Sequence, residues 1–542
     1  MAQGRDLLSL SELCLQNIAE NMQSLWLKDY TEKYLEEYHF MYIEGPFNQL
    51  SGVMVQELLR ILGESHKLNK AGLHLLLQPH LTELSLRPCA GLVSNAITHL
   101  ITRRCKILTS LDLHSCSRVP AASLVQLIEG LPRLTKLCLA DTQSDTNVLL
   151  AVGTGCQRLR ELDVSHCKKL SATSLPHLVY STKHGTFQCG GLRVLLMQGM
   201  KQHHVPEQWV NALCFLLLAV PSLEQVSNPA LSQALKLLRA NQFSTITVDG
   251  FPSLGEVVRA RTLAHKGCNG ILCPSGAEPF LQLKKLDDIE EEDLEIVGSL
   301  CPQVKEVAIS LGSLGGRSGN TVPWNHITHL TLHCPGQALR RLEELIPTLE
   351  GVGKELLFLS IQNVVWGEGQ SLDSLLRLCP NLRSFHCHLT SSAHPMYNIQ
   401  LAPWADNLRP IPLPHLHSFS LLLEGGDPIS TGFQHTLGGT LVSLFCGSPK
   451  LETLSLWGVP VELDMVFETV LSLGPPVPLC SLRGVSLCRS QVTQWGALLL
   501  LRSNNHLTSL DLSDCPHVTR RDFHKLQDSA RTHKLRLSIS WR

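Results

Sequence analysis

Apolar residues recur along this chain in a short alternating pattern, L-x-x-L-x-L. Four clear copies begin at Leu81, Leu108, Leu134 and Leu159, so their first positions are 27, 26 and 25 residues apart. Alternation with a period of two predicts a short strand with one buried face. After the strand, stretches such as 121–131 place their apolar residues on one side of a helix. Each repeat therefore predicts one strand and one helix.

The pattern continues to the end of the chain. Further copies lie at 192–197, 304–309, 327–332, 356–361, 382–387, 416–421, 451–456, 482–487 and 507–512, and weaker ones at 223–226, 243–248 and 535–539. One strand and one helix cannot bury their own apolar face, but stacked copies can, and this is the leucine-rich repeat. We expect an α/β fold: a leucine-rich-repeat solenoid (horseshoe) of about 15 repeats over 79–542, after a small all-helical N-terminal module over 1–78.

Nineteen cysteines are spread along the chain. Dense disulfide frameworks belong to small secreted domains, and no C-x-x-C pair indicates a zinc or redox site. Four cysteines instead stand three residues after the last strand position of a repeat, namely Cys89, Cys116, Cys167 and Cys515. A small side chain at this position satisfies the turning backbone, so we expect a structural role for them.

Charge and composition exclude several classes of function. The net charge is -1, and no long run of Lys and Arg favours binding to nucleic acid. The first residues do not resemble a secretory signal, and the longest apolar run, 212–220, is too short to span a bilayer. We expect a cytoplasmic or nuclear protein, or one found in both places.

Candidate catalytic residues are few. His386 and His388 alternate on a predicted strand, but no third ligand at suitable spacing accompanies them. No nucleophile-elbow, dinucleotide or kinase motif occurs, so we expect no enzyme, no cofactor and no metal. The acidic run 287–295 is interpreted as the solvated start of a helix.

The N-terminal segment before the repeats predicts a helix of its own. Ser9 and Glu12 fit a capping box, so the helix should begin at Leu10. Leu7, Leu10, Cys14 and Ile18 would then share one face. Such a helix can cap the open end of the repeats, present this face to a partner, or do both.

This stretch resembles the BC-box, (S/T/P/A)-L-x-x-x-C-x-x-x-(A/I/L/V), of elongin-binding ubiquitin ligase receptors. Ser9, Leu10, Cys14 and Ile18 match every defined position. The resemblance implies that the elongin B/C adaptor binds here, with Leu10 in an apolar pocket of elongin C and Cys14 packed beside it.

A second stretch resembles the cullin box that follows the BC-box in the Zyg and Zer receptors. Leu50, Met54 and Leu58 have its apolar spacing, but Ser51 stands where that family has proline. The resemblance implies a contact with cullin-2, or alternatively cullin-5, together with its RING protein. The order of segments also resembles the Zyg and Zer receptors, without their C-terminal armadillo domain.

We therefore expect a non-catalytic substrate-recognition subunit of a cullin–RING ubiquitin ligase. Its protein substrate would contact the polar positions of the strands, with the candidates Glu83, Ser85, Ser110, Asp112, Lys136, Glu161 and Asp163. Two alternatives stay open: a leucine-rich-repeat scaffold or inhibitor unconnected to a ligase, and an F-box receptor, as the cysteine-type repeats suggest.

Overall fold

The chain divides into two compact units. One comprises Met1–Leu286 and Ser299–Gln303, and the other Asp287–Gly298 and Val304–Arg542. The computed structural model describes residues 9–28, 46–200, 206–240, 250–264, 281–312, 322–335, 340–366, 371–390, 409–424, 431–473, 477–532 and 537–541.

The strands of the repeats run parallel and in chain order. Within the described residues they form a 16-stranded sheet, which confirms the predicted α/β leucine-rich-repeat solenoid. The first unit holds β1 (Glu83–Ser85), β2 (Ser110–Asp112), β3 (Lys136–Cys138), β4 (Glu161–Asp163), β7 (Val194–Leu196), β8 (Gln225–Ser227) and a hairpin of β5 (Tyr180–Ser181) and β6 (Thr186–Phe187). The second holds β10 (Glu306–Ser310), β11 (His329–His333), β12 (Phe358–Val365), β13 (Ser384–Thr390), β14 (Ser418–Glu424), β15 (Thr453–Trp457), β16 (Gly484–Ser486), β17 (Ser509–Asp511) and β18 (Ser538–Ser540).

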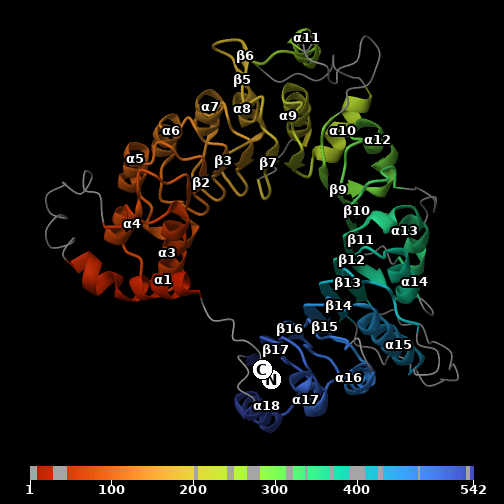
Figure 1. Ribbon diagram of the computed structural model, residues 1–542. Helices are drawn as coiled ribbons and strands as arrows, with labels where there is room; N and C mark the ends of the chain where they lie inside the picture. The colour runs from red at the N-terminus through yellow and green to blue at the C-terminus, as the bar shows by residue number, and fades with distance from the viewer. Residues whose placement is uncertain are drawn as a thin grey trace. The chain divides into compact units, whose positions relative to one another are not determined.

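Helices connect the strands and cover one face of the sheet. In Figure 1, α5, α6 and α7 lie outside β2–β4, and α13 and α14 lie outside β11–β13. The first unit has α1 (Leu10–Asn21), η1 (Met22–Leu27), α3 (Gly52–Glu64), α4 (Lys70–Leu76), η3 (Arg87–Leu92), α5 (Asn95–Arg104), α6 (Ala121–Glu129), α7 (Thr146–Gly155), η4 (Ala172–Ser174), α8 (Pro176–Val179), α9 (Pro206–Ala219), α10 (Leu231–Arg239) and α11 (Leu254–Ala264). After η6 (Glu291–Asp293) and α12 (Leu294–Leu300), the second has η7 (Leu342–Leu345), α13 (Ile346–Val352), η8 (Gly353–Glu355), α14 (Ser371–Leu378), α15 (Thr431–Gly447), α16 (Leu463–Ser472), α17 (Gln494–Arg502) and α18 (Arg520–Thr532).

The apolar pattern of the sequence becomes the core of each repeat. In β2 the central Leu111 is buried, while its neighbours Ser110 and Asp112 are half-buried on the opposite face. In α6 the buried side chains are Leu124, Leu127 and Ile128, one face of the helix. Strand and helix therefore bury their apolar sides against each other, as alternation and helical spacing predict.

The cysteines after the strands close the turn of each repeat. In three of these four turns the residue before the cysteine has a positive φ: Ser115 (61°), His166 (60°) and Asp514 (57°). The thiol of Cys167 donates to the Leu139 carbonyl (3.1 Å), and that of Cys515 to the Leu487 carbonyl (2.9 Å). Burial raises the pKa of the Cys515 thiol to about 11. Buried thiols that donate to backbone carbonyls fix the turn after the strand, which confirms the structural role of these cysteines.

One prediction of local structure needs correction. The acidic run predicted to start a helix instead begins as a strand, β9 (Lys285–Glu290), and helical structure starts only at Glu291. Leu286 and Ile289 of this strand are buried. Burial of these two side chains favours a strand here, although the segment is acidic. The weak copies at 223–226 and 535–539 do contain strands, β8 and β18, while 243–248 lies outside the described residues.

Among the residues that the structure describes, no helix is both long and apolar enough to cross a lipid bilayer.

Candidate functional site

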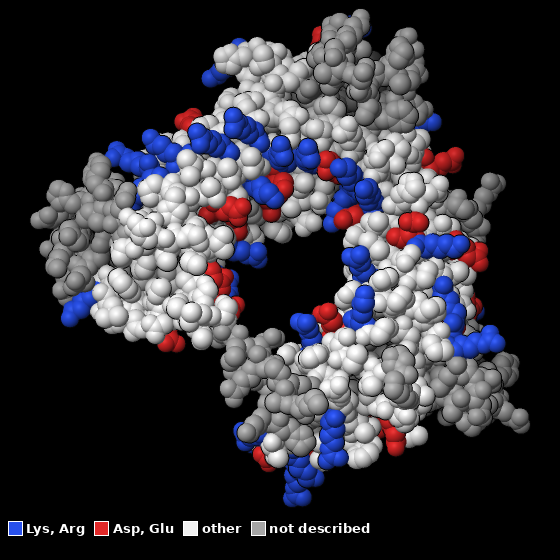
Figure 2. All heavy atoms as spheres, in the orientation of Figure 1, with Lys and Arg blue, Asp and Glu red and all other residues white. Residues whose placement is uncertain are grey.

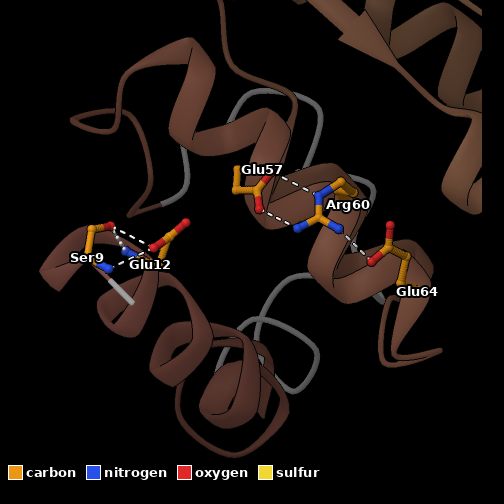
Figure 3. A network of polar contacts seen from close by, with 5 residues as sticks. All are labelled: Ser9, Glu12, Glu57, Arg60 and Glu64. Carbon is orange, nitrogen blue, oxygen red and sulfur yellow. Dashed lines mark hydrogen bonds and ion pairs between the residues drawn. The ribbon is translucent and has the colours of Figure 1, made fainter. Parts of the chain in front are cut away.

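Helix α1 begins where its capping residues predict. The Glu12 backbone N–H donates to the Ser9 hydroxyl (3.2 Å), and the Ser9 backbone N–H donates to the Glu12 carboxylate (2.7 Å). Figure 3 shows this reciprocal pair at the start of the helix. Because both free N–H groups find partners, the helix has a defined first turn at Leu10.

Helix α1 is apolar on two faces. One face is buried and carries Leu15 and Ala19, continued by Met22 in η1, and α1 contacts α3. The other face carries Leu10, Leu13 and Cys14, of which Leu10 is 79% and Leu13 49% exposed. A single apolar stripe would serve only to attach the helix to the repeats. The second, exposed stripe takes no part in that attachment.

The predicted BC-box residues lie along this second stripe. Ser9 caps the helix, Leu10 and Cys14 are exposed, and Ile18 is half-buried at the border between the two faces. Leu7, which was predicted to share this face, lies outside the described residues. The structure thus brings Leu10 and Cys14 together on the surface, one helical turn apart.

Helix α3 attaches the N-terminal helices to the repeats. Its Val55, Leu59 and Leu62 are fully buried. The Gln56 side chain pairs with the backbone of Ser85 in β1 like a neighbouring strand, accepting from the Ser85 N–H (3.0 Å) and donating to its carbonyl (3.2 Å). This pairing satisfies edge backbone groups that would otherwise need a strand or water.

The residues predicted to contact a cullin have different environments. Met54 is 38% exposed and Leu50 is half-buried, but Leu58 is fully buried. The prediction of Leu58 as a contact residue is therefore wrong, since it belongs to the packing of α3. Ser51, in the place of the family's proline, caps α3 by accepting from the Met54 N–H (3.4 Å).

A charged cluster lies on the solvent side of α3. Arg60 donates to Glu57 (2.5 and 3.0 Å) and to Glu64 (2.6 Å), as Figure 3 shows. The hydrogen bonds from Arg60 hold the pKa of the Glu57 carboxyl below its ordinary value. These exposed pairs lie one helical turn apart and contribute little to stability. Their carboxylates keep this side of the helix polar, in contrast to the exposed face of α1.

The predicted substrate-face residues all lie on β1–β4, where strand register aligns them in two rows. One row joins Glu83, Ser110, Lys136 and Glu161, and the other joins Ser85, Asp112, Cys138 and Asp163. Within the rows, Lys136 pairs with Glu161 (2.9 Å) and the Ser85 hydroxyl donates to Asp112 (2.8 Å). The residues therefore form one continuous polar surface on the strands.

The aspartates of this surface also have a structural task. Asp112 accepts from the His114 N–H (3.0 Å) and Asp163 from the Ser165 N–H (2.9 Å), which fixes the turn after each strand. Asp511 does the same for Ser513 (3.1 Å). Burial alone would raise the pKa of Asp511, but hydrogen bonds from Ser513 and Cys488 hold it below its ordinary value. These carboxylates are only in part available to a partner.

The two histidines considered as metal ligands lie on β13. His388 is close to Glu424 (3.3 Å), and burial, with the nearby His388, lowers the pKa of His386. Within the described ranges, no group of three or more His, Cys, Asp or Glu side chains is arranged to hold a metal ion.

Known proteins resemble this chain in structure and at low sequence identity. No family model matches the sequence. No curated protein matches it either. A yeast Rad7 and Elc1 complex is 13% identical, with 96% of this chain and 91% of that chain covered and a TM-score of 0.36. The leucine-rich-repeat protein LegL7 from Legionella pneumophila is 13% identical (55% and 89% covered, TM-score 0.30), and the mouse RP105/MD-1 complex 10% (88% and 84%, TM-score 0.37). At TM-scores this low, the likenesses say nothing about what this chain binds.

The structure adds exposed apolar residues that sequence analysis did not single out. In the N-terminal helices they are Leu13 on α1, Val53 at the start of α3, and Leu25 and Trp26 after α1, with Val53 81% exposed. Leu13 could have been found, because it lies three positions from Leu10 on the same face. Val53 could not, since its exposure depends on how α3 packs on the repeats.

Proposed function

We propose that this chain is a non-catalytic substrate receptor of a cullin–RING ubiquitin ligase, and that α1 binds the elongin B/C adaptor. The observation that carries the proposal is the exposed stripe of Leu10 and Cys14 on a helix whose other face is buried. The same residues match the BC-box pattern at every defined position.

The geometry suits recognition of a helix by a groove. Two apolar side chains one turn apart fill pockets, and a helix already folded and anchored loses little conformational entropy when it binds. Leu15 and Ala19 anchor α1 on the opposite side, so the adaptor need not compete with the chain's own core. A small thiol at Cys14 allows close approach of an apolar surface.

The remaining parts follow from this assignment. We place the adaptor module in the helices before β1, and the cullin contact at the exposed start of α3, around Leu50, Val53 and Met54. The polar strand surface of β1–β4 would hold the protein substrate. Catalysis would come from partner subunits, with the receptor raising the local concentration of substrate lysines near the charged E2.

A pulldown with purified elongin B/C tests the proposal. The wild-type chain should recover the adaptor, and the double variant Leu10→Ser, Cys14→Phe should lose it. Both side chains are exposed, so we expect the midpoint of thermal unfolding to stay near that of the wild type. An unchanged midpoint would show that loss of binding is not loss of fold.

Two matched variants sharpen the result. Leu25→Ser removes an exposed apolar side chain outside the motif and should still recover the adaptor. Val53→Asp should keep elongin B/C but lose cullin-2. If wild type recovers no adaptor, the scaffold alternative replaces the proposal. If the SCF adaptor is recovered instead, the F-box alternative does.

A further inference from the structure

One edge of the first unit gathers basic side chains that are scattered in the sequence. They lie in the four segments that lead into strands β2, β3, β4 and β7, namely 103–110, 129–136, 154–161 and 187–194. Figure 2 shows Lys and Arg in a row between helices α5–α7 and strands β2–β7. We call five of them, Lys106, Arg133, Arg158, Arg160 and Arg193, the basic rim, and all five are exposed.

Backbone hydrogen bonds set the spacing of the basic rim. The Arg160 N–H donates to the Thr135 carbonyl (2.7 Å), and the Arg193 N–H to the Arg160 carbonyl (2.7 Å). Arg160 and Arg193 therefore start neighbouring strands, which are about 4.8 Å apart in a sheet. Arg133 and Arg158 each stand one residue before the first leucine of successive repeats. The positive charges thus recur in successive repeats from β2 to β7.

Among the described residues, most of these charges lack an acidic partner. At one end, Arg193 lies 3.6 Å from Glu224, which also pairs with Lys284 (2.9 Å). In the described part of the chain, no carboxylate is within ion-pair distance of Lys106, Arg133, Arg158 or Arg160. Like charges at neighbouring positions repel each other, so a bound anionic group would relieve this repulsion.

We propose that the basic rim binds an acidic stretch of the protein substrate. The inference rests on the proposed receptor function, which makes this face the substrate side. Arginine suits the role because its planar guanidinium can hold a carboxylate through two hydrogen bonds. Polar side chains of the strands lie directly beside the rim, so an acidic stretch would be held at one edge of a longer contact.

A polypeptide fits this surface better than a nucleic acid does. Single-stranded nucleic acid needs aromatic side chains for its bases to stack on. The four segments hold one aromatic residue, Phe187, and its ring packs on Tyr180 at 5.3 Å. The neighbouring carboxylates of Glu83, Glu161 and Asp163 would repel a continuous phosphate backbone, whereas a peptide can change charge along its length.

Fluorescence anisotropy with a labelled peptide, in which a short run of glutamates is followed by a neutral Gly-Ser stretch, tests the proposal on the full chain. Wild type should bind, and binding should weaken as salt screens the charges. Arg158→Glu with Arg160→Glu should weaken binding about tenfold or more, because repulsion replaces attraction. The matched control, Lys168→Glu with Lys169→Glu, reverses two exposed charges in the turn at the other end of β4 and should stay within about twofold.

Three results would overturn the proposal: no binding by wild type at low salt, equal binding by the rim variant and wild type, or tighter rim-dependent binding of oligouridine. The last would assign the rim to nucleic acid. Failure of the basic-rim proposal can be distinguished from failure of the ligase proposal. The rim variant should still recover elongin B/C, and the Leu10→Ser, Cys14→Phe variant should still bind the peptide.

Discussion

Most described cysteines of this chain are buried in the repeats, whereas Cys14 is exposed on α1. Cys167 is buried after β4, where it donates to the Leu139 carbonyl and closes the turn of its repeat. Cys14 is exposed on α1 beside Leu10, with no part in the fold. The position in the repeat predicts the first role from sequence alone. The binding role that we propose for Cys14 comes from its resemblance to a binding motif.

A buried histidine makes the N-terminal helices sensitive to acid. His74 in α4 is 8% exposed, and burial, aided by the positive charges of Arg104 and Lys70, lowers its pKa from 6.5 to about 4. Between these two values the unfolded chain binds more protons than the folded chain. The free energy of unfolding therefore falls as the pH falls through this window, by up to about 1.4 kcal/mol for each unit of pKa shift.

We predict that His74→Gln reduces this acid sensitivity. The urea midpoint of wild type should fall between about pH 7 and about pH 5, and that of the variant should fall less. His99→Gln, which changes an exposed histidine of α5, should behave like wild type. Equal pH dependence of the His74 variant and wild type would contradict the prediction.

At the scale of elements, strand positions could be predicted well because the repeat spacing is regular. The capping box of α1 could be predicted too, since Ser9 and Glu12 interact within one turn. β9 could not, because its charged residues conceal two buried apolar positions, Leu286 and Ile289. The burial of Leu58 could not be predicted either, because it depends on how α3 packs against residues distant in sequence.

We predict that Gln56→Ala destabilises the first unit. The change leaves the N–H and carbonyl of Ser85 without their partner, at a cost of about 1–3 kcal/mol. Thermal unfolding followed by circular dichroism should show a lower midpoint. Gln49→Ala, which removes an exposed amide from the turn before α3, should leave the midpoint unchanged. Equal midpoints for the two variants would mean that the pairing with β1 contributes nothing.

At the scale of the whole molecule, the basic rim shows what sequence analysis could not provide. Its residues are about one repeat apart along the chain, so no window of sequence appears basic. Stacking brings them to one edge, although the net charge of the chain is only -1. The polar strand surface could be predicted because it follows directly from alternation along each strand.

We predict that alkylation of the folded protein separates the cysteines into two groups. Burial raises the pKa of repeat cysteines such as Cys116 and Cys156 to about 12, and these thiols should react slowly with iodoacetamide. Cys14 is the exposed cysteine among those described and should react quickly. Peptide mapping by mass spectrometry would measure both.

Elongin B/C should protect Cys14 from the reagent if it covers α1. Cys14→Ser supplies the control, since it should remove the fast-reacting peptide and leave the others unchanged. Slow reaction of Cys14 in the free chain would show that its thiol is covered in solution, contrary to its exposure on α1.

The placement of α3 across β1 also bears on how copies of this protein behave toward one another. A bare edge strand is a template on which a strand from a second molecule can add, and long parallel sheets make such templates at both ends. With the Gln56 amide already bonded to Ser85, a foreign strand would first have to displace the helix. The helix that supports α1 therefore also protects the β1 edge of the sheet from pairing with a second copy.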